Sequence, residues 1–372
     1  MRTRVLAGIV ASVCWLAVSA ATFEADSKRG ATLFRDQMCT NCHSVRGEGA
    51  NAAPDLGRRL DRNYTPAGIT SLMWNHAPAM WAAMEKQKLA LPQLSESQAA
   101  DLFAYFYASH YFEKPGEAQR GKALFTSKHC SECHALTSVA GSIAPPVTEW
   151  KALTDPVILV QRMWDHAPQM VQAMKTRGIE WPELTAQDLT DLLVYLQNLP
   201  QTRGAKLEFE LPPPTGGDEL FHTKGCANCH TDQRAFEALI GDSTLTDIAA
   251  ALWNHAPVME KSPANAPKPI AAAEMRKILS YVWARQFFST RGDDARGKKV
   301  FESNKCAVCH NDPSTGAPAL GRMEGPFSAV RMVSVLWKHG PAMQESMKSK
   351  HIPWPRLSPS DMANLVAYLN TR

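Results

Sequence analysis

Four copies of the pattern Cys-x-x-Cys-His divide the 372-residue chain into segments of similar length. The copies occupy residues 39–43, 130–134, 226–230 and 306–310, so neighbouring copies lie 80 to 96 residues apart. Eight of the nine cysteines belong to these motifs. Because a regular internal period indicates repeated structural units, the sequence predicts four small tandem domains in place of one large core.

The residue types of the motif define its chemistry. In a Cys-x-x-Cys-His segment, the two cysteines can form thioether bonds to a haem and the histidine can bind its iron. We therefore expect four covalently bound haem c groups and no structural disulfide. The predicted haem-attaching residues are Cys39, Cys42, Cys130, Cys133, Cys226, Cys229, Cys306 and Cys309. The predicted proximal iron ligands are His43, His134, His230 and His310.

Two helical segments flank each motif. Before the first motif, Gly30 precedes Phe34 by four residues, which places both on one face of a helix. The same pair recurs at Gly121 and Phe125, at Gly217 and Phe221, and at Gly297 and Phe301. An amphipathic helix with a tyrosine closes each unit, at Tyr105, Tyr195, Tyr281 and Tyr368, and Ser95, Thr185 and Ser358 are candidate helix caps. Since glycine is unfavourable inside a helix, its repetition predicts that the closing helix crosses the first helix there.

With this order of parts, each unit resembles a class I cytochrome c. The resemblance extends over nearly the whole chain after residue 20 and implies an all-α fold with four tandem cytochrome c-like domains, each holding one haem. It also implies that a proline carbonyl after the motif accepts a hydrogen bond from the proximal histidine and orients its ring. Pro54, Pro145 and Pro318 occupy the matching positions. The third unit has no such proline, so His230 must find another acceptor.

A third repeated segment lies between the motif and the closing helix. In the first unit it contains Trp74, His76, Pro78 and Met80, and the same four residue types recur at the same spacing in every unit. Many class I cytochromes bind iron through a methionine beside a proline just before the last helix, but Leu91, Trp181 and Trp354 stand there in this chain. We expect the distal ligands to be the methionines of the repeated segment, Met80, Met170, Met259 and Met343. The alternative distal ligands are His76, His166, His255 and His339, and the third possibility is an open iron position.

The histidine and methionine of this segment are four residues apart, so on a helix they share one face. The proline between them is expected to interrupt the helical hydrogen-bond ladder. The residue that does not bind iron is interpreted as a hydrogen-bonding partner of a haem propionate. The repeated tryptophan is given the same role, through its indole N–H.

The N-terminus has the pattern of a signal peptide over residues 1–20, with Arg2 and Arg4 before an apolar stretch and small residues before Ala20. We expect cytochrome c domains over residues 21–114, 115–204, 205–292 and 293–372, and refer to them as units one to four. Unit three is divergent in its loops. The leader predicts a periplasmic or otherwise exported protein, and no later stretch is long and apolar enough to span a membrane.

The formal charge of +4 falls to +2 when Arg2 and Arg4 are removed, which gives no basis for nucleic-acid binding. We expect an electron carrier that exchanges single electrons with redox partners in a respiratory chain and has no catalytic residues. One alternative is a haem enzyme or enzyme subunit, peroxidase-like or acting on sulfur compounds, which would need an open iron position. Another is a cytochrome subunit bound to a membrane redox complex, permanently or peripherally.

Overall fold

The computed structural model describes residues 23–57, 65–110, 116–139, 143–204, 209–230, 245–260, 268–288 and 291–372. The predicted signal peptide lies outside these residues. The fold is all-α, as the resemblance implies. Within the described ranges the only sheet is a two-stranded hairpin of β1 (Ser44–Val45) and β2 (Glu48–Gly49), directly after the first motif.

Each unit is built around three main helices. Unit one contains α1 (Ser27–Asp36), α2 (Pro66–Lys86) and α3 (Glu96–His110). Unit two contains α4 (Ala118–Ser127), α5 (Pro156–Thr176) and α6 (Ala186–Gln197). Unit three contains α7 (Gly217–Thr223), α9 (Leu245–Glu260) and α10 (Ala272–Phe287). Unit four contains α11 (Asp294–Ser303), α13 (Ala329–Ser349) and α14 (Pro359–Leu369), with the short α12 (Ala307–His310) in its motif.

Short 3₁₀ turns complete the units. Three of them lie in motifs: η1 (Cys39–Asn41), η3 (Cys130–Glu132) and η6 (Cys226–Asn228). The others are η4 (Val147–Glu149), η5 (Lys151–Leu153), η8 (Pro313–Thr315) and η9 (Leu320–Arg322). The closing helices of units one, two and four begin at the expected caps, because the side chains of Ser95, Thr185 and Ser358 each accept a hydrogen bond from the backbone N–H three residues later.

The predicted crossing of the first and closing helices is confirmed in all four units. A Cβ atom added to Gly30 would lie 2.0 Å from the carbonyl oxygen of Asp101, far inside van der Waals contact. The corresponding distances are 2.0 Å from Gly121 to Asp191, 2.4 Å from Gly217 to Lys277 and 1.9 Å from Gly297 to Asn364. Only glycine fits at these positions, because one backbone lies directly against the other.

Aromatic rings pack beside each crossing. The phenylalanine of the first helix contacts the tyrosine of the closing helix, with centroid distances of 5.8 Å for Phe34 and Tyr105 and 5.6 Å for Phe301 and Tyr368. The same contact measures 6.2 Å in unit two and 6.1 Å in unit three. Helix pair, glycine and ring contact therefore form one structural element that the chain repeats four times.

The middle helix of each unit is continuous through its proline, contrary to the expected interruption. Pro78, Pro168, Pro257 and Pro341 lie inside α2, α5, α9 and α13. A proline removes one backbone donor from the helical ladder and crowds the preceding turn, but the turns on either side keep their own hydrogen bonds. The histidine two residues before the proline and the methionine two residues after it therefore lie on one continuous helix.

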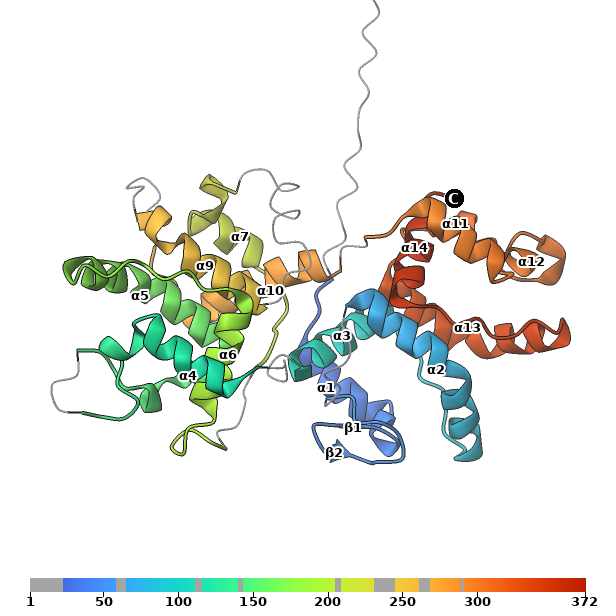
Figure 1. Ribbon diagram of the computed structural model, residues 1–372. Coiled ribbons are helices and arrows are strands. Elements are labelled where there is room, and N and C mark those ends of the chain that lie inside the picture. The colour runs from blue at the N-terminus through green and yellow to red at the C-terminus, as the bar shows by residue number, and fades with distance from the viewer. Residues whose placement is uncertain are drawn as a thin grey trace, which may run out of the picture.

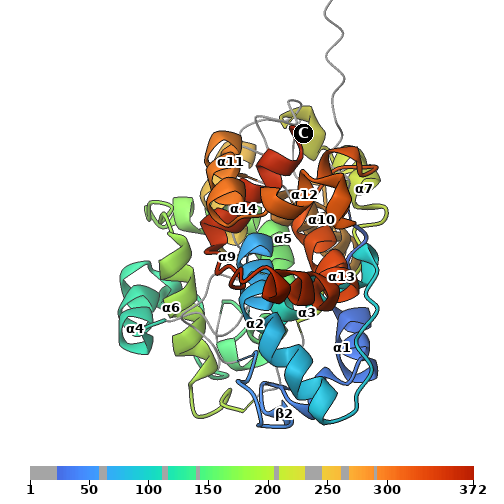
Figure 2. The same ribbon diagram turned by 90° about the vertical axis from the view of Figure 1, so that its right-hand side faces the viewer.

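The four units do not pack in chain order. Figure 1 shows two lobes, one made of the helices of units two and three and the other of those of units one and four. In the first lobe α5 packs on α9 and α10, and in the second α2 packs on α13 and α14. Figure 2 looks onto the second lobe, where α2 and α13 cross. The first and last units of the chain are thus direct neighbours.

Candidate functional site

The backbone has the same conformation directly before each of the four Cys-x-x-Cys-His motifs. The residue before the first cysteine adopts a left-handed conformation, with φ of 59° at Met38, 63° at His129, 92° at Gly225 and 64° at Lys305. This residue ends the turn after the first helix and reverses the chain. The following turn is closed by a hydrogen bond from the histidine N–H to the carbonyl of the first cysteine, for example 2.9 Å from His43 to Cys39.

The first cysteine of each motif packs against the hydrophobic core. Burial raises the pKa of Cys39, Cys130 and Cys306 to about 11, and it also raises the pKa of Cys226. Among the described residues, no three His, Cys, Asp or Glu side chains converge into a cluster that could hold a metal ion.

Three proximal histidines have the hydrogen bond that the resemblance implies. The ring Nδ1 of His43 donates to the carbonyl of Pro54 at 3.0 Å, and that of His310 donates to Pro318 at 3.0 Å. In unit two the distance from His134 Nδ1 to the carbonyl of Pro145 is 3.4 Å. With Nδ1 used in this way, Nε2 is the nitrogen that can bind iron. The loop after His230 lies outside the described residues, so its expected alternative acceptor does too.

The histidine of the middle helix interacts electrostatically with the proximal histidine in three units. Partial burial of its ring lowers the pKa of His76, and the charge of His43 lowers it further. In unit two the pKa of His134 is lowered by burial, with a further contribution from His166. In unit three burial, followed by the charge of His255, lowers the pKa of His230. In units one to three the repeated segment is therefore close enough to its motif for the two histidines to influence each other's charge.

The methionines of the repeated segment are less exposed than most of its histidines. Met80, Met170 and Met343 are half-buried, while His76, His255 and His339 are exposed and His166 is half-buried. The side chain of Met259 lies outside the described part of the structure. The two residue types lie one turn apart on the same helix, so both methionine and histidine remain candidate ligands.

The repeated tryptophans have different partners from those expected. The indole N–H groups of Trp74, Trp164 and Trp253 donate to backbone carbonyls of a neighbouring unit, at Pro355 (3.0 Å), Lys268 (3.1 Å) and Pro182 (2.6 Å) respectively. They are therefore interface residues and do not serve haem propionates. Trp337 is the exception, since its buried Nε1 has no acceptor among the described residues.

Two contacts, which we call the clamp, hold units one and four together: Asn75 binds the backbone of Leu357, and Trp74 stacks on Trp354. The amide of Asn75 makes two hydrogen bonds with the backbone of Leu357, of 2.8 Å to its carbonyl and 2.9 Å from its N–H. Beside it, Trp74 stacks on Trp354 with ring centroids 4.9 Å apart. In return, the indole of Trp354 donates to the carbonyl of Trp74 at 2.9 Å.

The interface between units two and three repeats this clamp. Asn254 makes the same pair of hydrogen bonds with the backbone of Leu184, both of 2.9 Å. Trp253 stacks on Trp181 at 4.2 Å, and the indole of Trp181 donates to the carbonyl of Trp253 at 3.1 Å. Sequence reasoning missed this role, although an Asn or Asp follows the tryptophan in three of the four repeats.

The residues around each motif fit a covalently attached haem. Each motif supplies two cysteines and a histidine, and a proline carbonyl orients the histidine ring in units one, two and four. The middle helix carries a His and a Met, and its histidine interacts electrostatically with the proximal histidine in units one to three. The buried indole N–H of Trp337 also fits such a group, because an unpaired buried donor costs free energy that a carboxylate acceptor would offset. A bound haem would supply reversible one-electron chemistry.

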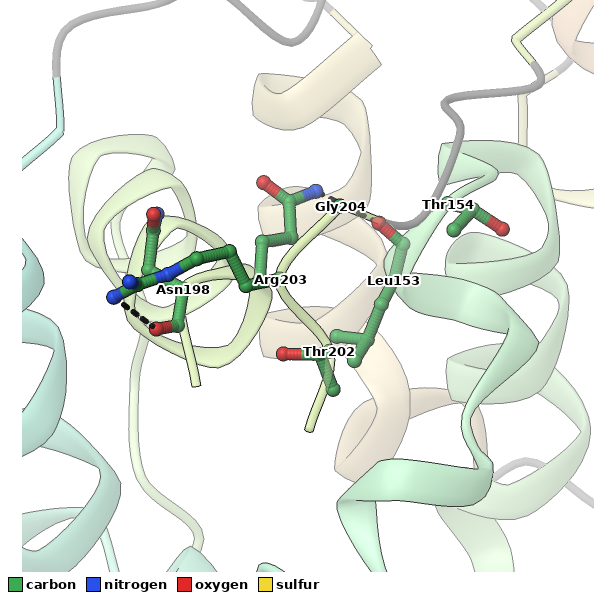
Figure 3. A pocket seen from close by; sticks show the side chains of 7 residues that line it. Leu153, Thr154, Asn198, Thr202, Arg203 and Gly204 are labelled. Atoms are coloured by element: carbon green, nitrogen blue, oxygen red, sulfur yellow. Dashed lines mark hydrogen bonds between the residues drawn. The ribbon is translucent and has the colours of Figure 1, made fainter. Parts of the chain in front are cut away.

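A small pocket of about 190 Å³ lies in unit two, between the end of α6 and η5 (Figure 3). Two hydrogen bonds shape its wall, one from Gln197 to the carbonyl of Leu153 and one from Arg203 to the carbonyl of Asn198. No histidine or cysteine lines this pocket. It is therefore distinct from the candidate haem sites.

Comparison with protein families identifies the class. Residues 27–107 and 295–372 each match the cytochrome c family, and residues 116–196 match the family of cytochrome c oxidase, cbb3-type, subunit III. The chain is a protein with several cytochrome c domains, and its cofactor is covalently bound haem c. Searches of curated proteins and of solved structures found no match.

Two of the family matches fall in units that pack against each other. The two segments that match the cytochrome c family lie in units one and four, which pair in one lobe. Within the described residues, no helix has both the length and the apolar character to span a membrane. Cytochrome c domains indicate haem-based electron transfer with redox partners.

Proposed function

We propose that the chain is an exported tetrahaem cytochrome that carries single electrons between respiratory partners. Its four domains occupy residues 21–114, 115–204, 205–292 and 293–372, after a signal peptide of residues 1–20. Each domain holds one haem c through the two cysteines of its motif. The observation that carries the proposal is the fourfold recurrence of the same helix crossing beside a Cys-x-x-Cys-His turn.

The proximal iron ligands are His43, His134, His230 and His310. The carbonyls of Pro54, Pro145 and Pro318 hold three of these rings in one tautomer and orientation, which raises the basicity of the ligating nitrogen. We assign Met80, Met170, Met259 and Met343 as distal ligands, supported by the half-buried positions of three of them. A methionine ligand favours a higher reduction potential than a second histidine would.

The protein's own contribution is to bind the haem, orient its ligands and shield it from water. The core that packs against Cys39, Cys130, Cys226 and Cys306 limits water at the attachment side. The axial ligands set a haem's potential over a range of about 0.8 V, and burial tunes it further. Rigid support from the helix crossing keeps the proximal loop in place and reduces the reorganisation that electron transfer requires.

A second candidate function is that of a cytochrome subunit bound to a membrane redox complex. The observation in its favour is the match of residues 116–196 to subunit III of cbb3-type cytochrome c oxidase. In that case unit two would contact the membrane partner. Co-purification of the protein with a membrane oxidase in fixed ratio, after mild detergent extraction, would establish this role.

A redox titration of the purified protein, followed by visible and near-infrared absorption, tests the carrier function. We expect four reversible one-electron steps, low-spin iron throughout and no binding of carbon monoxide by the reduced protein. The sulfur–iron charge-transfer band in the near infrared should be present in the oxidised form. High-spin ferric haem that binds carbon monoxide after reduction would contradict a pure carrier and favour an enzyme with an open iron position.

A further inference from the structure

The contacts between units place them in an order different from their order in the chain. Units two and three are joined by the clamp of Asn254 on Leu184 and by a second contact, in which the backbone N–H of Ile270 donates to Asp165 at 3.1 Å. Units one and four are joined by the clamp of Asn75 on Leu357. Each clamp connects the middle helix of one unit with the segment before the closing helix of the other.

Units three and one are joined by a different contact, which connects the two lobes. The backbone N–H of Ser27 donates to the carbonyl of Leu211 at 2.9 Å, and the N–H of Leu211 donates back to the Ser27 hydroxyl at 2.9 Å. The ring of Tyr107 in α3 contacts Trp283 and Phe287 in α10, at 5.2 and 5.4 Å. Ser27 and Leu211 are both nearly inaccessible to solvent, at 4% and 1% exposure.

These interfaces connect the units in the order two, three, one, four, and Figure 1 shows units two and three in one lobe and units one and four in the other. Electron tunnelling falls steeply with distance, so transfer follows units that touch and is indifferent to chain connectivity. In chain order, units one and four would be the ends of the route. In spatial order, units two and four are the ends, and unit one is an internal relay.

We propose that electrons move through this protein in the order two, three, one, four, in either direction, and that outside partners exchange electrons at units two and four. The proposal rests on the tetrahaem carrier function. The clamp residues Trp74, Asn75, Trp253 and Asn254 act as positioning residues, since they hold the two units of each pair against each other. With a haem bound in every unit, each step would transfer one electron, and the oxidation of one haem would be balanced by the reduction of the next.

The test is flash photolysis with a ruthenium polypyridyl photoreductant on a Ser303→Cys variant of the full protein. Ser303 is exposed at the end of α11 in unit four. Successive flashes should reduce all four haems of the otherwise unchanged protein. With haem one removed by Cys39→Ala and Cys42→Ala, prompt reduction should stop at haem four, because the relay is missing. With haem three removed by Cys226→Ala and Cys229→Ala, haems four and one should both be reduced promptly.

A route in chain order gives the opposite pattern. Loss of haem three would then stop prompt reduction at haem four, and loss of haem one would leave haems four, three and two connected. That pattern would overturn the proposed order. If a haem-deficient variant does not accumulate, Met80→His and Met259→His replace haem removal. Each keeps its haem and lowers its potential, so Met80→His should slow transfer beyond haem four by more than an order of magnitude.

The same experiment gives a different result if the proposed carrier function, and not the order of the units, is wrong. If the labelled parent protein accepts electrons at unit four but passes none onward, the carrier function itself is wrong. If all four haems of the parent are reduced and the two haem-deficient variants behave alike, the carrier function stands and the proposed order is wrong.

Discussion

Trp74 in α2 stacks on Trp354, 280 residues further along the chain, with ring centroids 4.9 Å apart and an indole hydrogen bond in each direction between the two segments. The pair joins the first unit to the last. The equivalent pair of Trp181 and Trp253 joins the two central units. Two interfaces of one kind therefore organise four tandem repeats into two nested pairs.

The amide clamp should contribute measurably to stability. Replacing Asn75 with alanine leaves the backbone N–H of Leu357 without its partner in a part-buried interface. An unpaired buried group of this kind costs about 1–3 kcal/mol, so the free energy of unfolding should fall by about that amount. Urea unfolding monitored by tryptophan fluorescence would measure it.

Lys338 provides the matched control, because it occupies the position of Asn75 in the middle helix of unit four and its side chain is exposed. Lys338→Ala should change the free energy of unfolding by no more than about 0.5 kcal/mol. Equal losses in the two variants would mean that the loss at Asn75 is a general effect of truncating a middle-helix side chain, and not a loss of the clamp.

The helix crossing predicts a strict requirement for glycine. In Gly30→Ala the new methyl group would lie 2.0 Å from the carbonyl oxygen of Asp101, so the two helices must separate. Overpacking of this kind costs about 1–3 kcal/mol. Thermal unfolding should show the loss, whereas Gly321→Ala, whose nearest neighbour would be Arg372 Cβ at 3.2 Å, should be milder. A neutral Gly30→Ala would refute the close crossing.

The second unit should be sensitive to acid through Asp191. Burial tends to raise the pKa of its carboxyl group, but hydrogen bonds from the Glu117 N–H, Arg120 and Gln187 outweigh this and hold the pKa below the ordinary value of 3.8. A lowered pKa in the folded state stabilises the fold above pH 3.8, and this stabilisation is lost as the pH falls through the lowered value.

Unit four suggests the variant that tests this pH dependence, since Asn364 accepts the equivalent N–H, from Asp293, without titrating. Asp191→Asn should unfold more easily at neutral pH but lose less stability than the parent on acidification. Unfolding curves measured across the acid range would show this. Parallel pH profiles for parent and variant would exclude Asp191 as the source.

The distal ligand can be assigned with one pair of variants. Met80→Ala should remove about a quarter of the near-infrared sulfur–iron band, because one haem of four loses its thioether ligand. His76→Ala, one helical turn away, should leave that band intact. If the band is absent from the parent and His76→Ala yields high-spin iron, histidine is the distal ligand.

Local features of the fold were predictable because each repeats within the chain. The glycine and phenylalanine spacing led directly to the crossing of α1 on α3, and the resemblance to class I cytochromes c implied Pro54 as the acceptor for His43. These contacts join residues of one unit, so sequence spacing constrains them strongly.

The pairing of units was not predictable in the same way. Four similar units can pair in several orders, and the choice depends on side chains that complement each other across long separations. Asn75 meets the segment around Leu357, but Lys338 in the corresponding helix makes no matching clamp among the described contacts. The role of Trp74 was misassigned for this reason, since its acceptor at Pro355 belongs to another unit.

The central claim is that one polypeptide carries four covalent haems, one in each unit. Intact-mass spectrometry of the exported protein, purified from a host that attaches haem c, tests it most directly. We predict a mass equal to that of residues 21–372 plus four haem groups, and peptide mapping that places one haem on each Cys-x-x-Cys-His motif. A fully matured protein with three haems or fewer, or with a motif found as free thiols, would contradict the account.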